Sequence, residues 1–102
     1  MREPGPMILA VGPTPTLARK ALEANGLSPD GGRQLRMVTR FTGLRGWSRG
    51  MPVVAVEIDR WDVLAGLEGD RLRETLLGMI NAGRLRLAQD ADLARFREET
   101  VQ

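Results

Sequence analysis

The sequence predicts an α/β fold in which helices cover both faces of a small, mainly parallel sheet of four strands. The first observation is the run over residues 53–59, which holds the chain's main stretch of β-branched and small apolar residues. A strand that is apolar on both faces needs cover on both faces. The second observation is that apolar residues recur at helical spacing over residues 17–22 and 72–80. We therefore expect residues 53–59 to form the central strand between helical layers.

The composition is that of one globular domain spanning residues 1–102, with frayed ends at 1–6 and 100–102. Of its 102 residues, 42% are hydrophobic and 27% are charged, a balance typical of folded proteins. No apolar run is long enough to cross a bilayer, and the first eleven residues do not resemble a signal peptide. We expect a cytoplasmic protein with no membrane partner.

The chain contains no cysteine and no histidine, which removes thiolate zinc sites and the commonest general base. An enzyme built from this chain would depend on carboxylates, hydroxyls, arginines and the single Lys20. We predict no catalytic residue and no cofactor. The net charge is only +2, and the pI of 10.4 is high because fourteen of the fifteen basic residues are arginine.

The first strand is expected over residues 7–11. Thr14 can cap the following helix, with Pro15 in its first turn, where proline is tolerated. Gly26 is expected to end this helix as the residue after the C-cap. Residues 28–32 are typical of a turn.

A second strand is expected over residues 35–41. Glycines at positions 43, 46 and 50 predict an irregular loop or a single turn over residues 42–50. This loop leads either to a parallel neighbour or to an antiparallel hairpin, and we favour the parallel arrangement.

Residues 60–69 are expected to form a loop or a short helical turn, with Trp61, Val63, Leu64 and Leu67 directed into the core. A second helix follows over residues 70–82 and stops at Gly83; its expected buried stripe is formed by Leu72, Leu76, Met79 and Ile80.

The short alternating segment Arg84, Leu85, Arg86, Leu87 predicts an edge strand. An exposed edge of this kind can pair with a second copy, so a homodimer is possible. Asp90 is expected to cap a final helix that carries Leu93 and Phe96. The resulting order, β-α-β-β-α-β-α, is that of a compact Rossmann-like sandwich.

Two candidate sites are weak. The loop over residues 12–16 follows the first strand, where doubly wound folds bind phosphates, but it lacks the glycine motifs and its prolines remove backbone donors. Glu57, Asp59 and Asp62 could hold Mg²⁺ if the central strand continues, since Glu57 and Asp59 would then share a face. Acidic residues commonly end a strand at the surface, so we assign no metal there.

The strongest candidate is a charge anomaly. Between residues 31 and 56 there are five arginines and no acidic residue, while the rest of the chain is net negative. With Trp47, these residues could contact nucleic-acid phosphates and bases, a protein partner or a second copy. The candidate surface consists of Arg33, Arg36, Arg40, Arg45, Trp47 and Arg49.

Residues 39–46 (Thr-Arg-Phe-Thr-Gly-Leu-Arg-Gly) lead into residues 52–56 (Pro-Val-Val-Ala-Val). This stretch resembles the strand, loop and strand of small α/β proteins of actinobacterial phages, some of which look like decayed P-loop folds. The resemblance implies a small accessory phage protein that acts on a host component in the host cytoplasm. Residues 12–16 stand where active P-loop proteins carry a glycine-rich loop with Lys and Ser or Thr.

These observations favour a non-enzymatic interaction protein that acts through the arginine-rich surface. A nucleic-acid-binding module using the same residues is the alternative. A second alternative is a Mg²⁺-dependent or nucleotide-binding protein with a degenerate P-loop-like fold.

Overall fold

The computed structural model describes residues 8–27 and 35–100, with side chains described up to residue 96. The expected turn at residues 28–32, Arg33 and most of the expected frayed ends lie outside these residues. The expected element order is confirmed. The elements are β1 (Ile8–Val11), α1 (Pro15–Ala24), β2 (Leu35–Val38), β3 (Met51–Val54), α2 (Trp61–Asn81), β4 (Leu85–Leu87) and α3 (Asp90–Thr100).

The four strands form one all-parallel sheet in the order β2-β1-β3-β4. The preference for a parallel arrangement is confirmed, but β2 and β3 are not neighbours, because β1 lies between them. Residues 39–50 therefore cross over β1. The chain winds in one direction from β1 to β2 and in the other from β3 to β4, as in doubly wound, Rossmann-like sheets.

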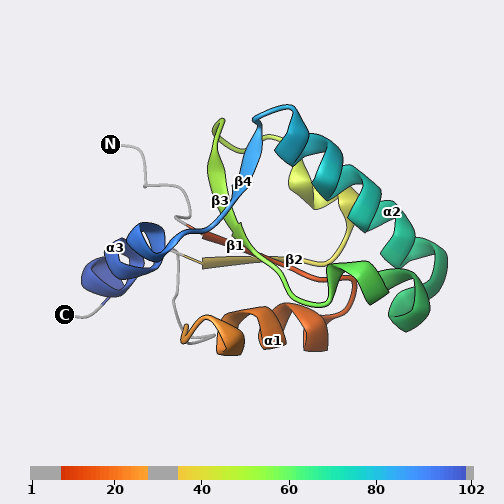
Figure 1. Ribbon diagram of the computed structural model, residues 1–102, viewed down its shortest axis with the longest axis horizontal. Coiled ribbons are helices and arrows are strands. Elements are labelled where there is room, and N and C mark those ends of the chain that lie inside the picture. Colours follow the sequence, from red (N-terminus) through yellow and green to blue (C-terminus); the bar gives the residue numbers. More distant parts are fainter. Residues whose placement is uncertain (1–7, 28–34, 101–102) are drawn as a thin grey trace.

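Helices cover both faces of the sheet, as Figure 1 shows for α1 below it and α2 above it. On one face, α1 and α3 pack against apolar residues of β1 and β3. On the other face, α2 and a 3₁₀ turn at Phe41–Leu44 cover a second apolar cluster that includes Trp61, Leu72 and Leu76. The expected sandwich is confirmed.

The expectation of one long central strand is wrong in its second half. β3 is an inner strand but ends at Val54, and the four residues of β1 are fully buried, so β1 shares the centre. Beyond the strand, the Val56 carbonyl accepts from the Trp61 indole N–H (2.9 Å) and has no partner in the ladder of a neighbouring strand among the described residues. Glu57 then adopts the left-handed region (φ 54°), which starts a 3₁₀ turn at Ile58–Arg60.

The ends of α1 follow the sequence prediction. The Thr14 hydroxyl accepts from the Leu17 amide (3.2 Å), and Pro15 is the first helical residue. At the other end Gly26 has φ 68°, and the Leu27 amide donates to the Leu22 carbonyl (2.9 Å). This bond across the end of the helix is typical of a Schellman motif, which requires a residue with positive φ.

Of the two alternatives expected for residues 60–69, a loop or a short helical turn, the structure has the helical one, and α2 already begins at Trp61. Gly66 interrupts this helix with non-helical angles (φ 62°, ψ −140°), so its two parts do not share one face. Trp61 is buried, but Val63, Leu64 and Leu67 are 76%, 41% and 67% exposed rather than directed into the core. No helix of the described residues is long and apolar enough to cross a membrane.

The last part of the chain needs two corrections. Gly83 (φ 74°) ends α2 as expected, and β4 is an edge strand. However, Leu85 is buried in the core, so of the two leucines only Leu87 is exposed for pairing with another copy. Asp90 is the first residue of α3, and it is Asp92 whose carboxylate accepts from the Gln89 amide (2.9 Å) at the start of the helix. The expected burial of Leu93 and Phe96 is confirmed.

Candidate functional site

The connection over residues 39–50 carries most of the predicted surface, and local contacts fix its shape. Leu44 is buried among core residues beneath it. The Trp47 indole N–H donates to the Gly43 carbonyl (2.7 Å), which closes the loop on itself. Gly46 and Gly50 have positive φ (87° and 78°), so the chain can reverse there. The loop is therefore anchored while its arginines remain exposed.

Backbone hydrogen bonds bring two further segments to this loop. The Gly50 amide donates to the Arg84 carbonyl (2.9 Å), which joins the entry of β3 to the entry of β4. The Arg84 amide in turn donates to the Met79 carbonyl (2.9 Å) at the end of α2. Arg49, Met79 and Arg84 are thus placed by ordered backbone, although they come from three elements.

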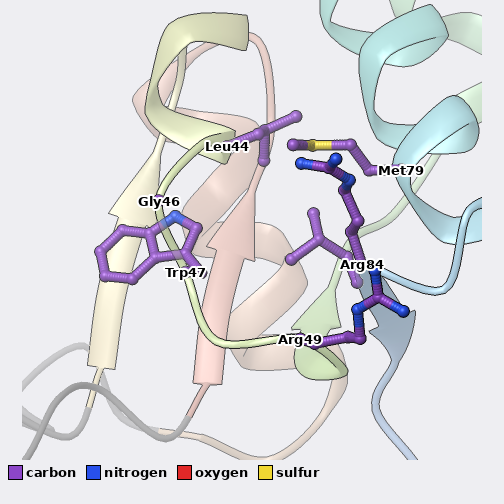
Figure 2. Close-up of a pocket in the computed structure, with 7 residues that line it drawn as sticks. Leu44, Gly46, Trp47, Arg49, Met79 and Arg84 are labelled. Atoms are coloured by element: carbon purple, nitrogen blue, oxygen red, sulfur yellow. The ribbon is translucent and has the colours of Figure 1, made fainter.

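A pocket of about 220 Å³ lies where these segments meet, at the amino ends of β3 and β4 (Figure 2). Figure 2 shows the Trp47 indole on one side and the Arg49 and Arg84 side chains on the other, with Met79 alongside Arg84. The full lining is Leu44, Gly46, Trp47, Arg49, Met79, Arg84 and Leu85.

A second pocket of about 440 Å³ shares Met79 and Arg84 with the first. Its other lining residues are Arg45, Thr75, Gly78 and Ala82, so it extends along the last turns of α2. We call the two pockets together the arginine groove. A ligand that entered one pocket would contact the wall of the other.

The arginine groove carries uncompensated positive charge. No described residue that lines it is acidic, and Arg45, Arg49 and Arg84 form no ion pair with a carboxylate of the described residues. Other arginines are neutralised: Arg60 pairs with Glu57 (3.3 Å), and Arg73 and Arg86 have aspartate partners. The partial negative charge at the end of α2 offsets only part of the excess.

Only part of the predicted surface comes together. Arg45, Trp47 and Arg49 lie in the groove, and the Arg36 guanidinium sits beside it, 6.0 Å from the centre of the Trp47 ring. Arg40 follows the opposite, carboxyl end of β2 and lines a separate pocket of about 540 Å³ with Pro13, Pro15, Thr39 and Glu68.

Sequence reasoning missed Arg84 and Met79 as members of the site. Arg84 was assigned to an edge strand and Met79 to a buried helix stripe. Their only sequence signal is Gly83, which ends α2 and turns the chain beside them. Nothing in the sequence places that turn next to residue 50.

The three carboxylates considered for Mg²⁺ are not brought together as a metal site. Glu57 binds Lys20 (3.5 Å) and Arg60, Asp62 lies 3.5 Å from the Arg73 guanidinium, and Asp59 is exposed on the 3₁₀ turn. The expectation that Glu57 and Asp59 share a strand face is wrong, since β3 ends before them. Among the described residues no group of three carboxylates could hold a metal ion.

The loop over residues 12–16 has a structural role. The Gly12 amide donates to the Val38 carbonyl (3.1 Å), and Thr14 caps α1. A Cβ at Gly12 would lie 2.6 Å from the Ala18 backbone nitrogen, so glycine is needed for α1 to pack closely. With prolines at 13 and 15, few amides are left for a phosphate.

The fold and site therefore define a small Rossmann-like α/β protein with a cationic groove at the amino ends of β3 and β4. Comparisons with protein-family models, with curated proteins and with solved structures found no match.

Proposed function

We propose that this protein is a non-enzymatic interaction protein that binds a negatively charged protein partner through the arginine groove. The observation that carries the proposal is a set of three guanidinium groups, those of Arg45, Arg49 and Arg84, that have no carboxylate partner among the described residues. Carboxylates of a partner would supply the missing counter-charges by bidentate hydrogen bonds.

The residue types in the groove suit protein recognition. Arginine, tryptophan and methionine are enriched in the cores of protein interfaces. Leu44 and Leu85 are buried beneath the pocket, and Met79 adapts its shape to a neighbour more easily than a branched side chain does. The charged groups among the described lining residues are all guanidiniums, with no carboxylate to serve as a general base.

The resemblance of residues 39–46 and 52–56 to small phage proteins supports a host protein as the class of partner. A second copy of this chain is another partner of the same chemical kind. Leu87 on the edge of β4 is 50% exposed and supports that contact. An acidic host segment agrees better with the groove, because in a symmetric contact between two copies the arginines that line it would face each other.

Nucleic acid is the second candidate, and the Arg36–Trp47 contact favours it. An indole beside guanidiniums can stack on a base while the arginines contact phosphates. However, Arg36 lies over the Trp47 ring and the indole N–H is already bonded to Gly43. The ring is therefore less free to stack than an open platform would be.

The test compares two labelled probes by fluorescence anisotropy: a poly-glutamate peptide and a single-stranded oligonucleotide of equal charge. We expect the peptide to bind, and the double variant Arg49→Ala, Arg84→Ala to lose at least about tenfold in affinity. Arg19→Ala, an exposed arginine on α1, is the matched control and should bind as the wild type does.

If only the oligonucleotide binds, the second candidate replaces the first. Three phosphate contacts would then give a slope of about −2 in log affinity against log salt. If neither probe binds even at low salt, the groove is not an anion-binding surface and the proposal fails.

A further inference from the structure

Gly78 is a glycine in the interior of α2 that the fold does not require. Glycine weakens a helix relative to alanine. A Cβ at Gly78 would meet nothing within 4 Å, whereas a Cβ at Gly69 in the same helix would lie 2.0 Å from the Trp61 carbonyl oxygen. Packing therefore explains Gly69 but not Gly78.

Gly78 lies on the floor of the arginine groove. The larger pocket is lined on the α2 side by Thr75, Gly78 and Ala82. Their side chains are small or absent, so the helix backbone lies close to the surface there. An absent side chain lets another backbone approach the helix closely. Next to this part of the helix surface lie Met79 and Arg84, the two residues that both pockets share.

The charges are distributed along the groove rather than gathered at one point. Arg45 lines the larger pocket, Arg49 lines the smaller one, and Arg84 lines both. Between the arginines lies Met79, a partly exposed apolar side chain that lines both pockets. Such a groove matches carboxylates that are spaced along a chain, with an aliphatic side chain between them.

We infer that the arginine groove binds an extended acidic segment of a partner protein, whose backbone crosses α2 at Gly78 and whose aliphatic side chain packs against Met79. This inference rests on the proposed function and adds the chemistry and the position of the bound segment. The arginines pair with the carboxylates of the segment, and Met79 contacts its aliphatic group.

The binding test uses three labelled peptides with the full-length protein. The first alternates glutamate and leucine, the second alternates glutamate and glycine, and the third alternates lysine and leucine. The first should bind most tightly, the second at least about threefold more weakly because it lacks the apolar contact, and the third should not bind. Equal affinity for the first two would overturn the aliphatic contact.

The position of the segment is tested with Gly78→Leu, which adds bulk to the floor of the groove at a position where a Cβ meets nothing within 4 Å. We expect its melting temperature to be at or above that of the wild type and its affinity for the glutamate–leucine peptide to fall by at least about tenfold. Ala94→Leu adds a similar side chain to an exposed position on α3 and should bind normally. Gly78→Ala should melt a few degrees higher and bind about two- to threefold more weakly.

The outcomes separate this inference from the proposed function. Normal binding by Gly78→Leu, together with lost binding by Arg49→Ala, Arg84→Ala, overturns the path over Gly78 and leaves the proposed function standing. No binding of any acidic peptide by the wild type removes both. Binding of an oligonucleotide with no binding of the peptides overturns the inference in favour of nucleic acid.

Discussion

The Arg86–Asp92 ion pair connects the edge strand β4 to the first turn of α3, and it makes a quantitative prediction about stability. The two guanidinium nitrogens of Arg86 donate to the two carboxylate oxygens of Asp92, one of them at 2.5 Å. The same carboxylate accepts from the Gln89 amide. The hydrogen bonds from Arg86 are the main cause that lowers the pKa of Asp92 from 3.8 to about 2; burial opposes them, and the hydrogen bond from Gln89 adds a smaller lowering effect.

The magnitude follows from this pKa. The difference between about 2 and 3.8 corresponds to about 2 kcal/mol of stabilisation before solvent screening. The Arg86 side chain is 44% exposed, and screening of such pairs reduces the contribution to about 1 kcal/mol. Asp92→Asn should therefore lower the free energy of unfolding by about 1 kcal/mol at neutral pH, or the melting temperature by about 4–8 °C.

The sign of the pH dependence is fixed by the lowered pKa. The folded state holds Asp92 ionised more strongly than the unfolded chain does, so the stabilisation is fully present above the unfolded pKa near 4. It is lost as the pH falls from about 4 through the folded pKa of about 2. The difference between wild type and Asp92→Asn should therefore close over this interval.

Urea unfolding followed by tryptophan fluorescence at neutral pH and at about pH 2 measures the difference in the free energy of unfolding. Arg86→Gln and the double variant complete a cycle that isolates the pair. A difference that is absent at neutral pH, or that persists unchanged at the acid end, would refute the reasoning.

Three further predictions concern stability and are measured by the same unfolding experiments. Gly69→Ala should destabilise the protein by about 2 kcal/mol or more, since the new Cβ would lie 2.0 Å from the Trp61 carbonyl oxygen; wild-type stability would contradict this packing. Trp61→Phe should cost about 2–3 kcal/mol, because it leaves a cavity and removes the hydrogen bond to Val56; a loss below about 0.5 kcal/mol would contradict it. Val63→Ser and Leu67→Ser should each change the free energy of unfolding by less than about 0.5 kcal/mol because both side chains are exposed. A large loss of stability would indicate that these side chains are buried in the core.

The candidate site shows where prediction from the sequence stops. The absence of acids between residues 31 and 56 singled out Arg45 and Arg49, which line the groove and have no carboxylate partner among the described residues. The same pattern included Arg40, which the parallel course of β2 carries to the opposite end of the sheet. It omitted Arg84, which is brought to the groove by a hydrogen bond to Gly50.

What the sequence by itself determined was local. Thr14 and Pro15 start α1, Gly26 and Gly83 end helices, and helical spacing places Leu72 and Leu76 on one face of α2, because each of these effects depends on residues within one or two turns of the chain. They are decided before any distant segment arrives.

Only the tertiary structure decided the strand order, the end of β3 at Val54 and the break in α2 at Gly66, beyond which the helix presents a different face. Parallel strands form the same ladder with any neighbour, so their order depends on which apolar faces the crossing segments cover. For the same reason the groove exists only in the fold: Arg49, Met79 and Arg84 become neighbours when β3 and β4 pair.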